Sequence, residues 1–235
     1  MSRQILVERF FETLISGNRA AARQVMQEAA SDEGLSPAEL VCDLFWPTYE
    51  TLSRLFKADQ LSTLSHHMAS RLLRVLVDQN ALKLPQAPSR NRRVFCVCGP
   101  GDSDELGAQM AYDLLEAAGF DVAFAGGGIA NDEILGQVNE HQPDVLLMFA
   151  SAPQDLPHIR QLIDTLHQIG ACPGMQIAVG GGVFNRAEGL AEEIGADLWA
   201  TGPMEMVGEL ITSPAKRAGS GQRTVGRNRK ARSAA

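Results

Sequence analysis

Cysteine is scarce in this 235-residue sequence: there are four, Cys42, Cys96, Cys98 and Cys172, and no CxxC pair among them. Such scattered thiols argue against a disulfide-stapled secreted domain and against a zinc ribbon. The sequence also lacks an uninterrupted apolar run of about 18 residues, the length that a membrane-spanning helix needs. Charged residues interrupt the apolar positions at its N-terminus, unlike those of a signal peptide. We therefore expect a cytoplasmic protein with reduced cysteines and no membrane contact.

Acidic residues are absent after Glu209, although the rest of the chain is rich in them. The chain has 28 acids against 21 Lys and Arg, and seven of those bases follow Glu209, so residues 1–209 carry a formal charge of −14 and the remainder +7. An acidic body argues against a broad nucleic-acid-binding face, which needs clustered bases. Residues 212–235 have almost no apolar bulk, so they are predicted to form a disordered basic tail. Any contact with nucleic acid would come through this tail.

Residues 1–83 lack any segment that alternates like a β-strand, and their apolar residues recur at helical spacing. The pattern predicts four helices, which begin near residues 5, 19, 36 and 62. Ser36-Pro37 is a favourable start for the third helix, and Pro47 predicts a kink inside it. Amphipathic helices with short connections indicate a small four-helix bundle. Residues 84–92 contain two prolines and no periodic pattern, so they are predicted to be a linker.

The segment 93–211 has a different period, because short β-prone runs alternate with helical patterning. The five runs are Val94–Cys98, Asp121–Phe124, Val145–Phe149, Gln176–Val179 and Asp197–Ala200. Such alternation predicts parallel strands joined by right-handed helical crossovers. The predicted fold class is therefore α/β, with the four-helix bundle followed by a flavodoxin-like (Rossmann-like) five-stranded parallel sheet. Ligands of such domains bind beyond the carboxyl ends of the strands.

No phosphate-binding loop and no complete dinucleotide fingerprint is present. Gly99 and Gly101 match the start of Gly-x-Gly-x-x-Gly, but Gly107 follows too late. Loops of small residues nevertheless follow three of the predicted strands, at 99–107, 150–153 and 180–185. Glycines allow backbone amides to approach a ligand closely. Together the three loops predict a cavity for an extended ligand at the carboxyl edge of the sheet.

A helical bundle followed by this α/β domain resembles the cobalamin-binding module shared by methionine synthases, corrinoid methyl-carrier proteins and cobalamin-dependent light-responsive transcription regulators. The family carries Asp-x-His-x-x-Gly, Ser-x-Leu and Gly-Gly motifs after its first, third and fourth strands. In the same order this sequence has Asp102-Ser103-Asp104-Glu105-Leu106-Gly107, Ser151-Ala152-Pro153 and Gly180-Gly181-Gly182. The resemblance implies that the motif residues Asp102, Ser103, Asp104, Glu105, Leu106, Gly107, Ser151, Gly180, Gly181 and Gly182 contact the lower part of a cobalamin and its nucleotide tail.

The cap of the family implies further contacts above the ring, from Phe56 and from His67, which is also the candidate metal ligand. Light-responsive relatives have a Trp and a Glu-His pair where this sequence has Phe56 and His66-His67. The histidine of the family's first motif ligates cobalt from below, and here that position is Asp104, a harder oxygen donor. The predicted cofactor is therefore cobalamin with its own base or water below cobalt, another tetrapyrrole such as haem, or none.

Each candidate also has a purely structural interpretation. The acids of segment 102–105 would favour the positive end of a helix dipole, Gly107 would allow close helix–strand packing, and Gly180–Gly182 would form a turn. Adjacent helical residues point about 100° apart, so at most one of His66 and His67 is expected to face the α/β domain.

The primary functional hypothesis is a non-catalytic sensor or regulatory module, for example in transcription regulation, with a regulatory protein as partner. It would hold a corrinoid or related tetrapyrrole between the bundle and the α/β domain. The first alternative is a corrinoid carrier subunit with a methyltransferase partner. Asp104 disfavours this alternative, because the family's lower histidine assists cobalt as it changes oxidation state. The second alternative is an interaction module that has lost its cofactor.

Overall fold

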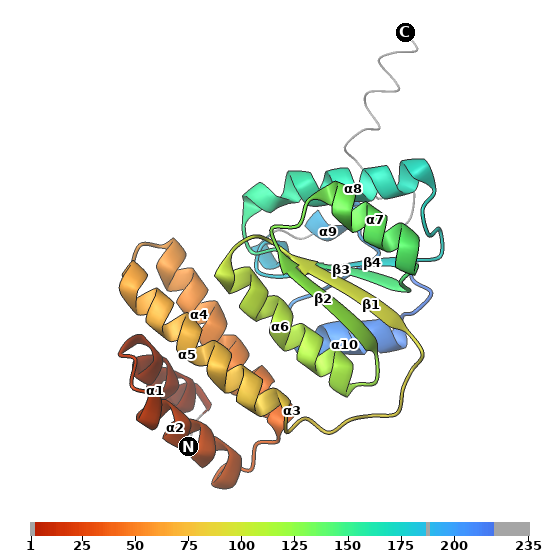
Figure 1. Cartoon of the computed structure of the whole chain (residues 1–235). Coiled ribbons are helices and arrows are strands. Elements are labelled where there is room, and N and C mark those ends of the chain that lie inside the picture. Colours follow the sequence, from red (N-terminus) through yellow and green to blue (C-terminus); the bar gives the residue numbers. More distant parts are fainter. Residues whose placement is uncertain (1–2, 187–188, 219–235) are drawn as a thin grey trace.

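The bundle and the α/β domain lie side by side in the computed structural model, which describes residues 3–186 and 189–218 (Figure 1). The bundle consists of α1 (Arg3–Ile15), α2 (Arg19–Ser31), α3 (Pro37–Leu40), a π-helical segment (Val41–Phe45), α4 (Trp46–Lys57) and α5 (Thr63–Ala81). These elements correspond to the four predicted helices. The third of them is built from α3, the π-helical segment and α4 in succession.

Side-chain caps and one proline explain where these helices begin and bend. The Ser36 hydroxyl accepts a hydrogen bond from the backbone N–H of Glu39 at 3.3 Å, and the Glu39 carboxylate accepts one from the Ser36 N–H at 2.8 Å. The kink predicted at Pro47 takes the form of the π-helical segment. Pro47 has no N–H for the carbonyl four residues earlier, and the N–H of Trp46 bonds to the carbonyl of Val41, five residues earlier. This wide turn sets the direction in which α4 continues.

The α/β domain is a parallel sheet with the strand order β2-β1-β3-β4-β5. Its strands are β1 (Arg93–Cys98), β2 (Asp121–Gly127), β3 (Val145–Phe149), β4 (Gln176–Gly180) and β5 (Leu198–Ala200). The helices α6 (Asp102–Ala117) and α10 (Pro203–Thr212) cover one face, and the other carries α7 (Asn131–His141), α8 (Leu156–Ile169) and α9 (Leu190–Ile194) (Figure 1). The predicted flavodoxin-like fold is confirmed. The strand order reverses between β1 and β3, which is where such sheets bind ligands.

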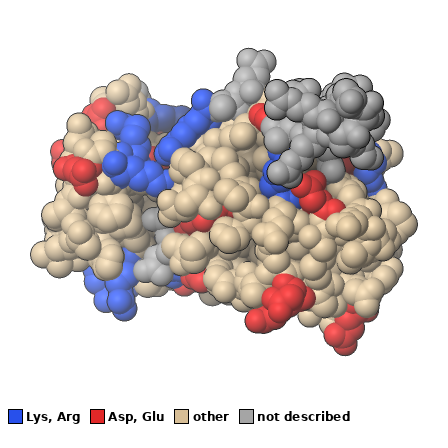
Figure 2. Space-filling view, turned by 90° about the horizontal axis from the view of Figure 1, so that it is seen from above, with Lys and Arg blue, Asp and Glu red and all other residues tan. Residues whose placement is uncertain are grey.

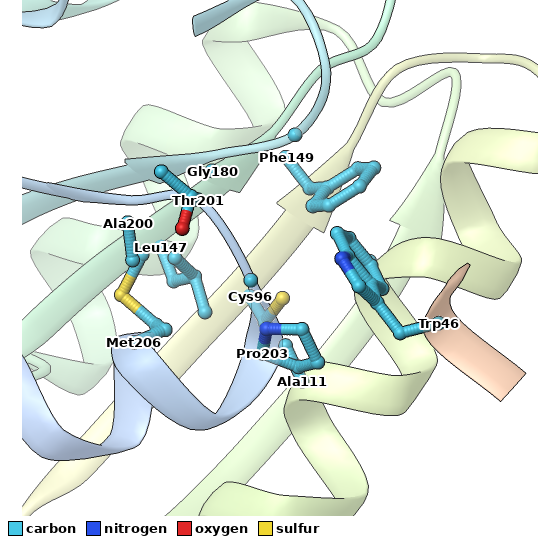
Figure 3. A pocket seen from close by; sticks show the side chains of 13 residues that line it. Trp46, Cys96, Ala111, Leu147, Phe149, Gly180, Ala200, Thr201, Pro203 and Met206 are labelled. Carbon is cyan, nitrogen blue, oxygen red and sulfur yellow. The ribbon is translucent and has the colours of Figure 1, made fainter. Parts of the chain in front are cut away.

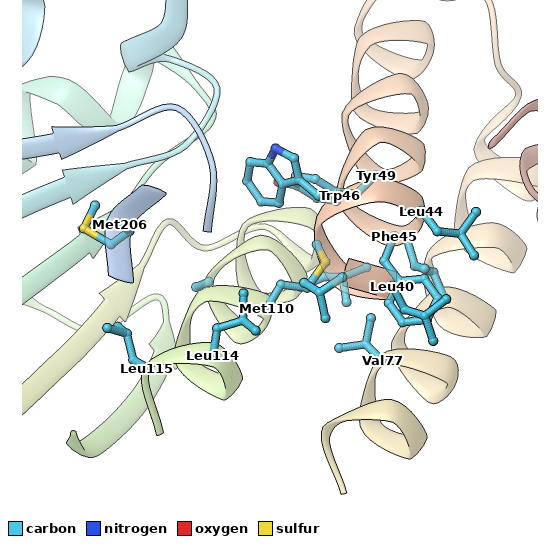
Figure 4. Packing of buried hydrophobic residues seen from close by; sticks show 14 of the residues in the cluster. Leu40, Leu44, Phe45, Trp46, Tyr49, Val77, Met110, Leu114, Leu115 and Met206 are labelled. Carbon is cyan, nitrogen blue, oxygen red and sulfur yellow. The ribbon is translucent and has the colours of Figure 1, made fainter. Parts of the chain in front are cut away.

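One hydrophobic core runs from the bundle through α6 and α10 to a face of the sheet (Figure 4). Fully buried side chains from both parts belong to it, among them Phe45 and Leu73 of the bundle and Met110 and Leu115 of α6. A second core lies under α7, α8 and α9. Because the first core is continuous across both parts, it fixes the bundle relative to the sheet edge on which ligands bind.

The segments predicted as linker and tail are both in contact with the α/β domain where the structure describes them. Two backbone N–H groups of residues 84–92 donate hydrogen bonds to the carbonyl of Ala117, at the end of α6, and to that of Gly119, just after it, at 2.8 and 2.7 Å. Helix α10 extends to Thr212, and the side-chain amide of the buried Gln176 donates to the carbonyls of Ser213 and Lys216, at 2.9 and 3.0 Å. The rest of the predicted tail, 219–235, lies outside the described residues. Within the described ranges, no helix has the length and apolar character needed to cross a membrane.

Candidate functional site

A cavity of about 1070 Å³ opens between the bundle and the carboxyl edge of the sheet. Helices α4 and α5 form one side, and the start of α6 and the loop after β3 form the other. Its lining includes Phe56, Lys57, His66, His67, Met68, Arg71, Arg74, Gly101, Asp104, Glu105, Ser151 and Ala152. The space is at the upper end of what small-molecule sites offer, so it can take a large organic ligand.

The bundle side of this cavity includes a pair of stacked aromatic rings. The rings of Phe56, on α4, and His66, on α5, are stacked with centroids 4.0 Å apart and planes 13° from parallel. His66 is buried, whereas His67 is exposed and its ring lies 6.0 Å from that of His66. Both histidines line the cavity. The cavity extends around α5 and is lined by most positions from 66 to 75, so a place in its lining does not require that both histidines face the α/β domain.

The opposite side is formed by a buried carboxyl group. Asp104, in the first turn of α6, is only 5% exposed, and Gly99 makes room for it, since a Cβ at Gly99 would lie 2.6 Å from Oδ2 of Asp104. Burial raises the pKa of the Asp104 carboxyl, and hydrogen bonds from the side chain and backbone of Ser151 partly offset this. Oδ1 of Asp104 is buried and has no hydrogen-bond partner in the part of the chain that the structure describes. It is therefore an acceptor that a ligand N–H group can satisfy.

A second carboxyl group and a lysine lie close to Asp104, and the lysine also lines the cavity. Oδ2 of Asp155 would lie 3.0 Å from the same Cβ at Gly99, and it too is buried without a hydrogen-bond partner among the described residues. Lys57 donates a hydrogen bond from Nζ to the backbone carbonyl of Ser151 at 2.8 Å. Burial and the nearby Arg186 lower the pKa of the Lys57 amine, and the charges of both carboxyl groups oppose this change. The floor thus combines one acceptor for a ligand, Asp104, with one cation, Lys57, which moderates the negative charge of both carboxyl groups.

The mouth of the cavity is basic although the body of the protein is acidic. Arg74 of α5 and Glu105 of α6 form an ion pair across the gap, at 3.3 Å. Arg19, Lys57 and Arg71 line the same cavity, and Lys and Arg side chains gather on the bundle side of this face (Figure 2). The mouth therefore favours a neutral or anionic ligand over a cationic one.

A much smaller cavity, of about 20 Å³, lies between the sheet and α10 (Figure 3). It is lined by residues of the α/β domain and by one bundle residue: Cys96, Leu147, Phe149, Gly180, Gly181, Ala200, Met206 and Trp46. The Trp46 indole meets the Phe149 ring edge-on, with centroids 6.3 Å apart and planes at 85°. A space of this size holds about one water molecule.

The three consecutive glycines after β4 have different structural reasons. Gly181 has a φ of +106°, and a Cβ there would lie 2.1 Å from the carbonyl oxygen of Ala150, so the turn itself requires glycine. A Cβ on Gly182 would meet nothing within 4 Å. Gly182 instead borders a third cavity, of about 690 Å³, which lies along α4 and shares Lys57 and Ser151 with the large one. The turn therefore explains one of these glycines, and open space for a ligand surrounds another.

Two family models, both described as B12 binding domain, match the chain, one over residues 92–208 and the other over residues 6–79. The chain belongs to the B12-binding domain family. Dimethylamine corrinoid protein 1 of Methanosarcina acetivorans is 22% identical over 209 residues, which are 88% of this chain and 96% of that protein. Monomethylamine corrinoid protein 1 of the same organism is 21% identical over 211 residues, 87% of this chain and 95% of that protein.

A solved structure has the same fold as this B12-binding chain. The monomethylamine corrinoid protein of Methanosarcina barkeri superposes with a TM-score of 0.75 at 17% identity, covering 88% of this chain and 97% of that one. The two family models confirm the family resemblance, and this structure shows the same fold.

The first motif of this B12-binding chain contains residues with different surroundings. Asp104 and Glu105 line the large cavity, whereas Leu106 is 2% exposed and packs in the core that joins the two parts. Helical periodicity turns Leu106 away from its neighbours. Gly107 is also away from the large cavity, because a Cβ there would lie 2.5 Å from Cζ of Phe149. Residues 102 and 103 begin α6, and the positions of their side chains are not described.

His67 stands apart from other metal-binding side chains. Within residues 3–186 and 189–218 there is no group of three or more His, Cys, Asp or Glu that could hold a metal ion. A metal beside His67 would therefore have to arrive with most of its ligands, as it does in a tetrapyrrole.

Three residues of these sites were not among the sequence-based candidates: Lys57, Asp155 and Trp46. Lys57 directly follows the candidate Phe56, but a lysine at a helix end commonly extends into solvent. Asp155 comes four residues after Ser151 and carries no motif of its own. Trp46 precedes the proline that was expected to kink the helix, and this bulky residue at a predicted bend is the signal that could have identified it.

Proposed function

We propose that this chain binds a corrinoid in the 1070 Å³ cavity and serves as the corrinoid carrier of a methyltransferase system. The observation that carries the proposal is that the stacked Phe56 and His66 and the polar floor around Asp104 face one cavity from opposite domains. Membership of the B12-binding family supports the ligand. The names of the curated relatives, dimethylamine and monomethylamine corrinoid proteins, support the carrier role over that of a sensor.

The side chains present suit a corrin ring, a flat macrocycle bordered by neutral amides. The stacked pair offers a planar surface to one face of the ring. On the other side, the unsatisfied Oδ1 of Asp104, which lines the cavity, can accept a hydrogen bond from a peripheral amide N–H. The amide carbonyls can in turn accept from Lys57 and from the arginines at the mouth. Each side of the cavity thus has side chains that can contact the ring or hydrogen-bond to its amides.

A bound corrinoid supplies a cobalt centre that accepts and releases a methyl group, and the chain positions it. The interdomain core holds the two sides of the cavity at a fixed separation. Lys57 keeps positive charge beside the carboxyl groups of the floor. Asp104 stands at the motif position of the family's histidine, so a corrinoid bound here would meet a carboxyl group at that position.

The residue at position 104 favours a second candidate function, the non-catalytic sensor or regulatory module with a regulatory protein as partner. A carboxylate is a poor substitute for imidazole at a cobalt centre. Ligand binding alone does not require that ligation, whereas the carrier must support cobalt through its change of oxidation state.

Ligand retention tests the proposed cofactor. The full-length chain is incubated with hydroxocobalamin and, in parallel, with haem, then desalted, and its visible spectrum is recorded. We expect about one corrinoid per chain to be retained, and His67→Ala to reduce retention. The matched control is His158→Ala, an exposed histidine on α8 outside the cavity. Failure to retain corrinoid would overturn the proposal, and retention of haem alone would assign a different tetrapyrrole.

Methyl uptake separates the carrier from the sensor. The corrinoid-loaded protein is reduced with titanium(III) citrate and exposed to radiolabelled iodomethane, which supplies the methyl group and releases iodide. A carrier is expected to retain about one labelled methyl per bound corrinoid after desalting. Bound corrinoid without uptake of label would support the sensor instead.

A further inference from the structure

The small cavity beside the glycine loop lies where the family resemblance places the nucleotide tail of the cofactor. It is bounded by strands β1, β3, β4 and β5 and by α6 and α10, with Gly180 and Gly181 at its edge (Figure 3). Its volume is about 20 Å³, enough for roughly one water molecule and far too small for a heteroaromatic base. This small cavity, here called the tail slot, is therefore closed in this chain, and its lining residues show which side chain closes it.

An aromatic residue of the bundle occupies the mouth of the slot. Trp46 is 8% exposed; it packs edge-on against Phe149, with ring centroids 6.3 Å apart, and at a tilt of 35° against Tyr49, with centroids 5.2 Å apart. A Cβ on Gly202, the residue before α10, would lie 3.5 Å from the indole Nε1, so the indole reaches across to the far wall. Its flat ring system thus fills the end of a space that could otherwise receive a flat base.

Backbone geometry holds Trp46 in this position. It follows the π-helical segment Val41–Phe45 and precedes Pro47, so both the wide turn and the fixed φ of proline restrict its backbone. The Phe149 ring is restricted in turn, because it lies against the backbone of Gly107, where a Cβ would be 2.5 Å from Cζ. Neither ring can move aside without disturbing the core that joins the two domains.

We propose that Trp46 closes the tail slot, so that this chain recognises a corrinoid by its ring and does not insert the lower nucleotide base. This inference rests on the proposed function. It has a direct consequence for ligand choice: a complete cobalamin and a cobinamide, which lacks the nucleotide, bind with similar affinity. The ring is held by the interdomain cavity, and the base does not enter the slot beside Gly180 and Gly181. The third cavity, which borders Gly182 and Trp46, lies outside this slot.

The test compares the dissociation constants of hydroxocobalamin and diaquocobinamide for the full chain. We expect the two values to agree within about threefold for the unchanged protein. Trp46→Ala removes the indole from the slot and is expected to tighten cobalamin binding at least about tenfold relative to cobinamide. The matched control is Trp199→Ala, which removes the other tryptophan of the chain, a β5 residue whose indole bonds to Glu192 at 3.2 Å and lines neither cavity. It should leave the ratio unchanged.

Thermal unfolding of each variant shows whether it is folded, and Phe149→Ala opens the slot by a second route if Trp46→Ala fails to fold. Unchanged protein that binds cobalamin at least about tenfold tighter than cobinamide would overturn the inference while leaving the proposed function intact. A slot-opening variant with an unaltered ratio would also overturn it. Failure of the unchanged protein to bind either corrinoid would refute the proposed function itself, and the inference with it.

Discussion

Replacing Gly107 by alanine measures how rigidly the aromatic residues of the interdomain core are packed. A Cβ at this position would lie 2.5 Å from Cζ of Phe149 and 2.8 Å from the hydroxyl oxygen of Tyr49. Both distances are shorter than real carbon contacts, so the rings must shift, and overpacking of this kind costs about 1–3 kcal/mol. Alanine gains about 0.5–1 kcal/mol over glycine inside a helix. We therefore expect Gly107→Ala to lower the free energy of unfolding, by up to about 2.5 kcal/mol.

The assay is urea unfolding followed by circular dichroism, with Gly136→Ala as the matched control. Gly136 also lies inside a helix, α7, but a Cβ there would meet nothing within 4 Å. This control should gain about 0.5–1 kcal/mol. In the background of Phe149→Leu the cost of Gly107→Ala should fall by about 1 kcal/mol, because the ring tip that it meets is gone. If Gly107→Ala stabilises the protein as much as Gly136→Ala does, the rings are not fixed and this reasoning is refuted.

Three further changes test the buried polar groups. Burial raises the pKa of the Asp113 carboxyl to about 7, so the free energy of unfolding should fall as pH rises from about 4 to 7. Asp113→Asn should remove this pH dependence, which amounts to up to about 4 kcal/mol. Urea unfolding at several pH values measures it. Lys57→Met should raise the pKa of Asp104, because it removes a nearby positive charge; carbon-13 NMR titration of that carboxyl would show no change if the charges do not interact. Deleting residues 213–235 should cost about 1–3 kcal/mol in urea unfolding, because the buried amide of Gln176 loses both its acceptors; a shorter truncation that keeps them should cost less.

The fold could be predicted from the sequence because its local signals agree with one another. Helical periodicity, the Ser36-Pro37 start and short connections all indicated a bundle, and the later change to alternating strands and helices indicated a parallel sheet. Both were confirmed. The sequence predicted a bend at Pro47 but not that the bend would be a π-helical segment. A proline shows where a backbone N–H is missing, whereas which carbonyl the preceding N–H then reaches depends on how the following helix packs.

Sequence motifs identified candidate residues of the site, but they did not predict which side chains would surround those residues. The loops after β1, β3 and β4 could be predicted because glycine and serine after a β-prone run can be recognised in the sequence itself. The proximity of Lys57, Asp104 and Asp155 could not be predicted, because α4 approaches the strand ends only through tertiary packing. The closure of the slot by Trp46 has the same origin, since a bundle residue fills a space in a domain that begins far along the chain.

Asp104 interacts with several neighbouring residues, so it differs from a single substitution in an otherwise unchanged family site. Its Oδ2 lies so close to Gly99 that a Cβ there would be 2.6 Å away, and Ser151 hydrogen-bonds to the carboxyl. Lys57 supplies an opposing charge, and it is itself held by the carbonyl of Ser151 at 2.8 Å. An imidazole is larger than a carboxyl group and would displace this arrangement. Restoring the family's ligand set would therefore require changes on α4 and in the loop after β3, together with the change on α6.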